Sequence, residues 1–131
     1  MHARLSQAEK RYLERARVCR VASRDGRGTP HVAPLCHAFD GARRTAYVYT
    51  TGRTARNLSR RPRAALECDD YFENWDRIRG LVAETRARIL RRGSELNRAR
   101  QLLQEKFKQY RDYEIDEVIA LHIERVTSWG L

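Results

Sequence analysis

The residues best suited to chemistry lie in one short stretch, TTGRTARNLSRRPR, at positions 50–63. The stretch follows a strand-like run that ends at Thr50, and we expect a loop that turns into one short helix, ended by Pro62. Hydroxyl groups, a glycine and two arginines, Arg53 and Arg56, therefore gather at a helix N-terminus. Free backbone N–H groups and the positive end of the helix dipole favour an anion there. Because residues three apart share a helix face, both guanidinium groups could reach one phosphate. The stretch predicts a phosphate-binding site.

The cysteines and two of the histidines predict structural roles rather than a metal site. Cys19, Cys36 and Cys68 are odd in number, have no metal-ligand spacing and fall in strand-like segments. We therefore expect reduced, buried thiols. His31 and His37 lie six positions apart on one strand, so they share a face but are too far apart to hold one metal ion together. We expect each to be held by hydrogen bonds as a structural residue, and we assign no metal ligands.

Other polar and aromatic side chains predict packing and charge balance. Tyr47 and Tyr49 share a strand face, where we expect core packing, and His122 is expected on the outer face of the last strand. Asp69 and Asp70 are adjacent, so they point to opposite sides of a strand and cannot form a catalytic carboxylate pair. We expect them to balance nearby arginines. No nucleophile motif is present, and the catalytic residues stay unassigned.

The chain is strongly basic, with 27 lysine and arginine residues against 17 acidic ones and a net charge of +10. Such a surface attracts either a phosphorylated or polyanionic small molecule or a nucleic acid. The arginines are spread along the whole chain and form no single block with interleaved aromatic residues. We therefore expect a solvated basic surface or an anionic small ligand, and we do not expect a nucleic-acid partner.

The length of 131 residues supports one domain, spanning residues 1–131, with a modest hydrophobic core. The sequence contains no apolar run long enough to span a bilayer and no charged-then-apolar leader. We therefore expect no membrane partner and a cytoplasmic location.

The elements that must position these residues follow from turn signals and hydrophobic periodicity. Ser6 and Glu9 form a capping box that opens a short helix ending near Arg15. Strand patterns and one long helical stripe follow, with turn signals at 25–28 and 40–41. The expected strands are 16–23, 29–39, 46–50, 64–71, 77–90 and 118–126, and the expected long helix is 94–110. Together they predict a mainly β (α+β) protein, a six-stranded antiparallel closed or split β-barrel with two or three peripheral helices.

Four segments, in the order in which they occur, resemble the pyridoxamine phosphate oxidase-like split barrels. The first two resemble the first hairpin and the phosphate signature of that family. The last two resemble a branch that is often classed as deazaflavin-dependent. The similarity runs in register from about Leu13 to Gly130, which is nearly the whole chain. The segments are 17–36 (RVCRVAS, DG and TPHVAPLC), 56–66 (RNLSRRPRAAL), 69–78 (DDYFENWDRI) and 124–130 (ERVTSWG).

The resemblance implies a homodimer of six-stranded barrels, with two flavin-type cofactors bound in clefts between the subunits. Carried over position by position, the loop and short helix would hold the cofactor's phosphate and ribityl hydroxyls. One strand would line the ring, largely through backbone groups, and two tryptophans would form the cleft wall, with the second subunit as one source of them. The implied residues are Val32, Pro34, Leu35 and Cys36 on the strand, Thr50, Thr51, Arg53, Thr54, Arg56 and Asn57 in the loop and helix, and Trp75 and Trp129 in the wall.

Two positions depart from the family's pattern. Many flavin-binding relatives have a lysine in the phosphate loop, where this chain has only arginines. Arginine binds phosphate bidentately, so we expect phosphate binding to persist, while the cofactor preference stays open. The run GLVAET at 80–85 stands where relatives more often show a strand rich in Val, Arg and Gly, and we expect Glu84 to face outward.

The resemblance implies a flavin- or deazaflavin-dependent oxidoreductase, because the bound ring takes or gives a hydride. The partner of the ring would be a small, flat, conjugated organic substrate in an open cleft. Backbone N–H groups near residues 32–36 could stabilise negative charge on the reduced ring. FMN is the first cofactor we expect, and the deazaflavin coenzyme is the alternative.

Two hypotheses from other classes stay open. One is a non-catalytic flavin- or haem-binding protein on the same barrel, for which His31, His37 or His122 would supply an axial ligand. The other is a basic nucleic-acid module, whose binding would depend steeply on salt.

Overall fold

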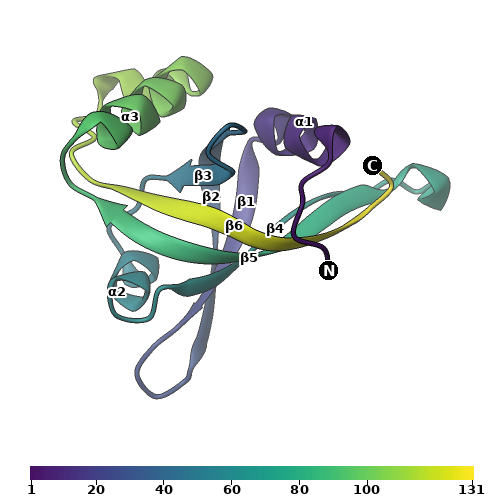
Figure 1. Ribbon diagram of the computed structural model, residues 1–131, viewed down its shortest axis with the longest axis horizontal. Helices are drawn as coiled ribbons and strands as arrows, with labels where there is room; N and C mark the ends of the chain where they lie inside the picture. Colours follow the sequence, from purple (N-terminus) through teal and green to yellow (C-terminus); the bar gives the residue numbers. More distant parts are fainter.

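Six antiparallel strands close into a barrel in the order β1-β2-β3-β6-β5-β4 (Figure 1). The predicted fold class is confirmed, and three α-helices accompany the barrel. The computed structural model describes residues 1–131, and none of its helices is long and apolar enough to cross a membrane. The elements are β1 (Val18–Arg24), β2 (Pro30–Asp40), β3 (Thr45–Val48), β4 (Arg63–Asp70), β5 (Arg79–Leu90), β6 (Val118–Trp129), α1 (Gln7–Arg15), α2 (Arg53–Arg60), α3 (Ser94–Lys106) and the 3-10 turns η1 (Trp75–Arg77) and η2 (Lys108–Asp112).

The single helix predicted over 94–110 is divided in two by Phe107. α3 ends at Lys106, Phe107 adopts an extended backbone with φ −122° and ψ 103°, and η2 follows as a separate turn. The Phe107 amide still donates to the Leu103 carbonyl at 2.9 Å and so closes the last turn of α3. The break buries the Phe107 ring, and the Arg17 guanidinium lies 4.8 Å above the ring centre. Packing of this ring therefore accounts for the early end of the helix.

The protein has two hydrophobic cores because α3 covers one outer face of the barrel. Inside the barrel, Leu66, Leu81 and Leu121 are fully buried among inward-facing residues of the other strands. Outside it, Tyr47 and Ala120 pack beneath α3 in a second cluster. The first half of β6 is therefore buried on both faces, which a simple alternation of polar and apolar residues does not predict.

The alternation predicted for β5 is confirmed, since residues 81, 83, 85 and 87 are buried whereas 86 and 88 are exposed. Glu84 faces outward, as expected, and is half-buried. The β5–β6 ladder shifts register beside it, because Glu84 lies opposite Arg125 but Thr85 lies opposite Ile123. Glu124 is therefore an extra residue in β6, and the bulge increases the local twist.

Close packing around residue 80 explains why a glycine begins the unusual run at 80–85. It lies opposite Trp129 at the end of β6. A Cβ atom at position 80 would lie 2.5 Å from Trp129 Cζ2 and 2.7 Å from the Cys68 carbonyl oxygen. The indole of Trp129 packs directly on this backbone, so a glycine is required there.

Helix α1 is held to the end of the barrel by the buried carboxylate of Glu9. Both hydrogen bonds of the predicted capping box are present, between Ser6 and Glu9. Glu9 also accepts a 2.7 Å hydrogen bond from the Ser128 hydroxyl of β6 and lies 3.1 Å from His2 Nε2. His2 in turn exchanges two backbone hydrogen bonds with Val126. One carboxylate therefore joins the N-terminal segment, α1 and β6.

We expect Glu9→Gln to lower the free energy of unfolding by about 1–3 kcal/mol, because it removes charge-assisted hydrogen bonds from a buried site. Burial, the largest effect, raises the pKa of Glu9, but hydrogen bonds from Ser6, Ser128 and His2 outweigh it and hold the pKa below 4.5. The stabilisation is therefore complete above pH 4.5 and is lost as the pH falls through the folded pKa.

Urea unfolding at pH 7 and at lower pH measures both effects. The matched control is Glu105→Gln on the exposed face of α3, which should change stability by less than about 0.5 kcal/mol. Equal effects of the two substitutions would contradict the role of Glu9.

Candidate functional site

Helix α2 forms where the sequence predicts it, after β3 and before β4. It begins at Arg53, ends at Arg60 and is followed by Pro62. Gly52 precedes it, and no side chain caps its N-terminus, so backbone N–H groups of the first turn stay free. In Figure 1, α2 lies at the lower side of the barrel, away from α1 and α3. The predicted site therefore occupies one end of the molecule by itself.

Two predicted site residues anchor the helix instead of facing solvent. Thr54 and Asn57 are buried, together with Leu58, on the side of α2 that packs against the barrel. Asn57 Nδ2 donates to the Ser23 Oγ of β1 at 3.1 Å, and both groups are buried. This hydrogen bond ties the start of α2 to the β1–β2 hairpin.

A small cavity of about 230 Å³ lies on the other side of the helix. Thr51 and Arg56 line it, and two residues that the sequence did not single out, Arg91 and Glu117, complete it. Arg91 Nε is paired with Glu117 at 2.9 Å, whereas Arg56 has no carboxylate partner. A cavity with a hydroxyl and an unpaired guanidinium is suited to an anion. No local signal could reveal Arg91, because it reaches the cavity only through the pairing of β5 with β6.

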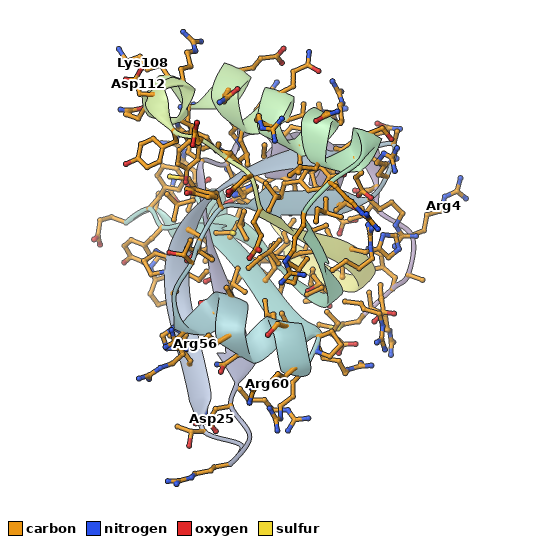
Figure 2. All side chains as sticks on the ribbon, turned by 90° about the vertical axis from the view of Figure 1, so that its left-hand side faces the viewer. Arg4, Asp25, Arg56, Arg60, Lys108 and Asp112 are labelled. Carbon is orange, nitrogen blue, oxygen red and sulfur yellow. The ribbon has the colours of Figure 1, made fainter.

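The two arginines of the predicted phosphate site lie in different surroundings. Arg53 is exposed and lies near Asp25, at the turn of the β1–β2 hairpin. Backbone hydrogen bonds from Thr29 and Arg27 lower the pKa of Asp25 most, and the Arg53 charge lowers it further. Figure 2 shows Arg56 on α2 and Asp25 on the hairpin at the same end of the molecule. Arg56 lines the cavity, and Arg53 flanks it from the hairpin side.

The strand predicted to line a ring has an unpaired edge. Residues 30–36 of β2 pair with β1, but β3 pairs only with His37–Asp40. Val32 and Pro34 are exposed, and Leu35 and Cys36 are half-buried. The backbone groups on the second edge of this segment therefore have no strand partner. Because α2 also packs on β2, this edge and the helix N-terminus belong to one region.

The two predicted wall residues lie elsewhere in the chain's own fold. Trp75 is 71% exposed in η1, and its Nε1 lies 3.4 Å from the Tyr71 hydroxyl. Trp129 is 37% exposed at the end of β6. Both belong to the end of the sheet that carries the chain's C-terminus, whereas α2 lies at the opposite side (Figure 1). A single chain therefore does not bring them to α2.

The remaining predictions for polar residues are confirmed where the structure gives their contacts. Asp69 lies 3.0 Å from Arg20, and Asp70 lies 3.0 Å from Arg79. His122 is exposed on the outer face of β6. The aromatic prediction also holds, since Tyr47 is in the core beneath α3 and Tyr49 packs against that core. All three cysteines are free; the prediction of burial is confirmed for Cys19 and Cys68 but is wrong for Cys36, which is half-buried.

His37 is a structural histidine, as expected, and it lies near an unusual lysine. Its Nε2 bonds to the Leu13 carbonyl of α1 at 2.9 Å, and the ring is fully buried. Burial, and then the Lys106 charge, lower the pKa of His37 to about 4. Lys106 donates to the Ala16 carbonyl, and burial followed by the nearby Arg17 lowers its pKa to about 8. His37 therefore holds no ligand and stays neutral at physiological pH.

Comparison with known proteins places the whole chain in one group of folds. The family model described as Pyridoxamine 5′-phosphate oxidase matches residues 5–130. No curated protein matches the sequence. Among solved structures, a conserved hypothetical protein from Mycobacterium tuberculosis is 22% identical with a TM-score of 0.81, covering 97% of this chain and 86% of that one.

Two further structures show how varied the ligands of this fold are. HutZ, the haem storage protein from Vibrio cholerae, is 17% identical with a TM-score of 0.75, covering 98% of this chain and 94% of that one. An FAD-binding protein from Mesorhizobium loti is 20% identical with a TM-score of 0.74, covering 95% and 94%. At these identities the likeness shows the shared fold.

We expect the neutral state of His37 to make the protein less stable in mild acid. The pKa of His37 is about 4 in the folded chain and 6.5 in the unfolded chain. Between these two pH values the unfolded chain therefore binds a proton at His37 and the folded chain does not. Stability is therefore full above pH 6.5 and falls as the pH drops from 6.5 to 4. His37→Gln keeps a donor for the Leu13 carbonyl and should flatten this dependence. Urea midpoints at pH 7 and 5 measure the effect, and ring signals of His37 that titrate near pH 6.5 would contradict it.

Proposed function

The chain belongs to the pyridoxamine 5′-phosphate oxidase family, and from this we propose that it is a cytoplasmic oxidoreductase that binds FMN or, alternatively, a deazaflavin coenzyme. It would pass a hydride between the bound ring and a small organic substrate in a cleft between two subunits. The observation that carries the proposal is the free N-terminus of α2 beside an unpaired edge of β2. The three free thiols fit a reducing compartment.

The residues around α2 fit the phosphate end of such a cofactor. Thr51 and Arg56 line one cavity, and the free N–H groups of the first helical turn point out of the N-terminus. A hydroxyl, a guanidinium and backbone N–H groups are all donors, and a phosphate offers only acceptors. Arg53 adds a second positive charge from the hairpin side. These residues would bind and orient the phosphate.

The unpaired edge of β2 fits the polar edge of a flavin-type ring. Such a ring supplies the hydride chemistry when it is bound. Backbone N–H groups between Val32 and Cys36 would donate to the ring, and these donors would stabilise negative charge that develops on it. Pro34 has no N–H group, and the N–H groups of Ala33 and Leu35 face β1, so the free donors on this edge are those of Val32 and Cys36. No side chain of this chain is assigned as a proton donor.

The choice between FMN and a deazaflavin coenzyme depends on two features that point in different directions. The compact phosphate loop suits FMN, although arginine replaces the lysine that many flavin-binding relatives have there. The segment 69–78, which contains η1 and Trp75, resembles the deazaflavin-dependent branch. Both cofactors therefore belong to the proposal.

We further propose a homodimer that uses the outer face of β1, β2, β4 and β5. Val18 and Val32 are 44% and 63% exposed on this face. At its centre Arg20 lies 3.0 Å from Asp69 and 3.8 Å from Glu67. Glu67 Oε1 is buried without a partner, and burial, followed by Asp69, raises the pKa of this carboxyl. A face with two exposed valines and an incompletely satisfied ion cluster suits a second copy, which would also bring Trp75 and Trp129 to the other subunit's α2.

A non-catalytic haem- or flavin-binding role is the second candidate, because the fold is shared with a haem storage protein. His37 cannot serve as an axial ligand since its ring is buried against α1. His31, which is half-buried on β2 near the unpaired edge, remains available. An iron-dependent Soret band lost in His31→Ala would favour this candidate.

We expect Arg53→Ala combined with Arg56→Ala to weaken FMN binding by about a hundredfold, at about tenfold for each lost guanidinium–phosphate contact. Riboflavin lacks the phosphate, so its binding should change by less than about twofold. Quenching of flavin fluorescence measures both, and a parallel titration uses the deazaflavin coenzyme. The matched control, Arg4→Ala with Lys108→Ala, removes the same charge from exposed positions away from α2 (Figure 2).

Two results would refute the oxidoreductase proposal. One is unchanged binding of both cofactors in the Arg53 and Arg56 double variant. The other is a native protein that binds neither FMN nor the deazaflavin coenzyme, after which haem titration becomes the next experiment.

We expect Val18→Lys to convert the dimer to a monomer, because it would bury an ammonium group in the apolar part of the interface. The exposed position keeps the change from disturbing the barrel core. Light scattering after size exclusion gives the mass. The control Gln101→Lys on α3 should remain a dimer, and a native mass equal to one chain would overturn the interface.

A further inference from the structure

The largest cavity of the molecule lies away from α2 and is lined by arginines. It has a volume of about 510 Å³ and is formed by α1, the ends of β4 and β5, and the chain's C-terminus. Figure 1 shows α1 and the C-terminus on the side of the barrel opposite α2. Its arginines come from two parts of the sequence: Arg11, Arg15 and Arg17 from α1 and the residues after it, and Arg79 from β5. We call this cavity the arginine cleft.

The positive charge of the arginine cleft is not balanced within the chain. Its only side-chain carboxylate, Asp70, is paired with Arg79 at 3.0 Å. Arg11 and Arg15 lie one helical turn apart on α1 and have no ion-pair partner. Arg17 stacks over Phe107 and donates to the Lys106 carbonyl at 2.8 Å.

Lys106 lies beside Arg17, next to the arginine cleft. Burial lowers its pKa most, and the charge of Arg17 is the next cause, so its pKa falls to about 8. Like charges held this close destabilise one another unless an anion joins them.

The C-terminal end of α1 has features that reduce its repulsion of an anion. The C-terminus of a helix carries free carbonyl groups and the negative end of the dipole. Here the Leu13 carbonyl accepts from His37 and the Ala16 carbonyl accepts from Lys106. Arg15 adds a positive charge in the last turn. Two of the carbonyls at this end of α1 are therefore already satisfied by donors.

The floor of the arginine cleft is rigid and leaves room for an organic molecule. Tyr12 is buried beneath it, and the Arg79 guanidinium lies 5.5 Å above the Tyr12 ring centre while Asp70 holds its Nε. A fixed guanidinium loses little freedom when it binds an anion. The volume exceeds that of a single phosphate, and the small residues Ala8 and Ala16 leave the walls open.

We propose that the arginine cleft binds a small polyanion, a molecule with two or more phosphate or carboxylate groups, at a site separate from α2 of the same chain. Four arginines line one volume, and two of them, Arg11 and Arg15, have no carboxylate partner, so a single negative charge would leave one of these two unmatched. Polyanion binding in the cleft does not require a flavin. This proposal can therefore be tested independently of the proposed oxidoreductase activity.

Calorimetric titration of the full chain with pyrophosphate and, separately, with citrate tests this proposal. We expect saturable binding of at least one of them, one molecule per chain. Pyrophosphate alone would assign phosphate groups as the recognised chemistry, and citrate alone would assign carboxylates. Arg11→Gln with Arg15→Gln should weaken binding by about a hundredfold, at about tenfold for each guanidinium. Both side chains are exposed and unpaired, so the variant should fold.

A matched control separates the site from general surface charge. Arg27→Gln with Arg92→Gln removes the same net charge from exposed positions outside the cleft and should weaken binding by less than about twofold. Bound polyanion should also raise the pKa of Lys106 above 8, which nitrogen-detected NMR of its ammonium group measures. Arg53→Ala with Arg56→Ala, the variant that tests the cofactor site, should bind the polyanion normally.

Three results would overturn the proposal. The first is no saturable binding of pyrophosphate or citrate at millimolar concentrations. The second is equal weakening in the cleft variant and the charge-matched control. The third is loss of binding in the Arg53 and Arg56 double variant, which would place the anion at α2 instead. Failure of FMN binding alone would leave this proposal intact.

Discussion

One mismatch of strand length shapes this barrel. β2 has eleven residues and β6 has twelve, but β3, which lies between them, has only four. β3 therefore pairs with residues 37–40 of β2 and 119–122 of β6 and reaches no further. The parts of both long strands beyond β3 carry backbone groups that the sheet cannot satisfy. Such groups must be hydrogen-bonded by other parts of the chain or be left for water, a ligand or a partner.

Only one of the two unpaired edges is covered by another part of the chain. The far end of β6 is covered by the N-terminal segment, where His2 pairs with Val126 and Glu9 accepts from Ser128. The beginning of β2 receives no such cover, and the uncapped N-terminus of α2 lies in the same region. The first arrangement completes the fold, and the second leaves donors available to a ligand. Both features arise because β3 is short. The N-terminal segment pairs with the part of β6 that β3 leaves unpaired, whereas the part of β2 that β3 leaves unpaired belongs to the proposed cofactor site.

Arginine side chains lie in several different surroundings on this basic surface. Arg20 and Arg79 are paired with carboxylates, and Arg17 stacks on an aromatic ring, so these groups are ordered by their partners. Arg11 and Arg56 have no such partner, and each lines a cavity. The net charge alone is compatible with a solvated surface, a nucleic acid or a small anion. The unpaired Arg56 in one hollow and the unpaired Arg11 and Arg15 in another, at opposite sides of the barrel, favour small anions.

The sequence by itself determined the elements whose signals are local. The capping box of α1, the short helix ended before Pro62 and the alternation of β5 all follow from near neighbours in the chain, where propensity and periodicity act. The same patterns predicted the six-stranded barrel, and the resemblance to a known family added the region of the proposed cofactor site. Only the tertiary structure decided that Phe107 ends α3, that Arg91 joins Arg56, and that Trp75 and Trp129 lie away from α2. The arginine cleft is of the same kind, because its residues come from α1 and from strand ends nearly seventy positions away. Strand register and barrel closure bring such residues together, and no local pattern encodes where separate segments will meet.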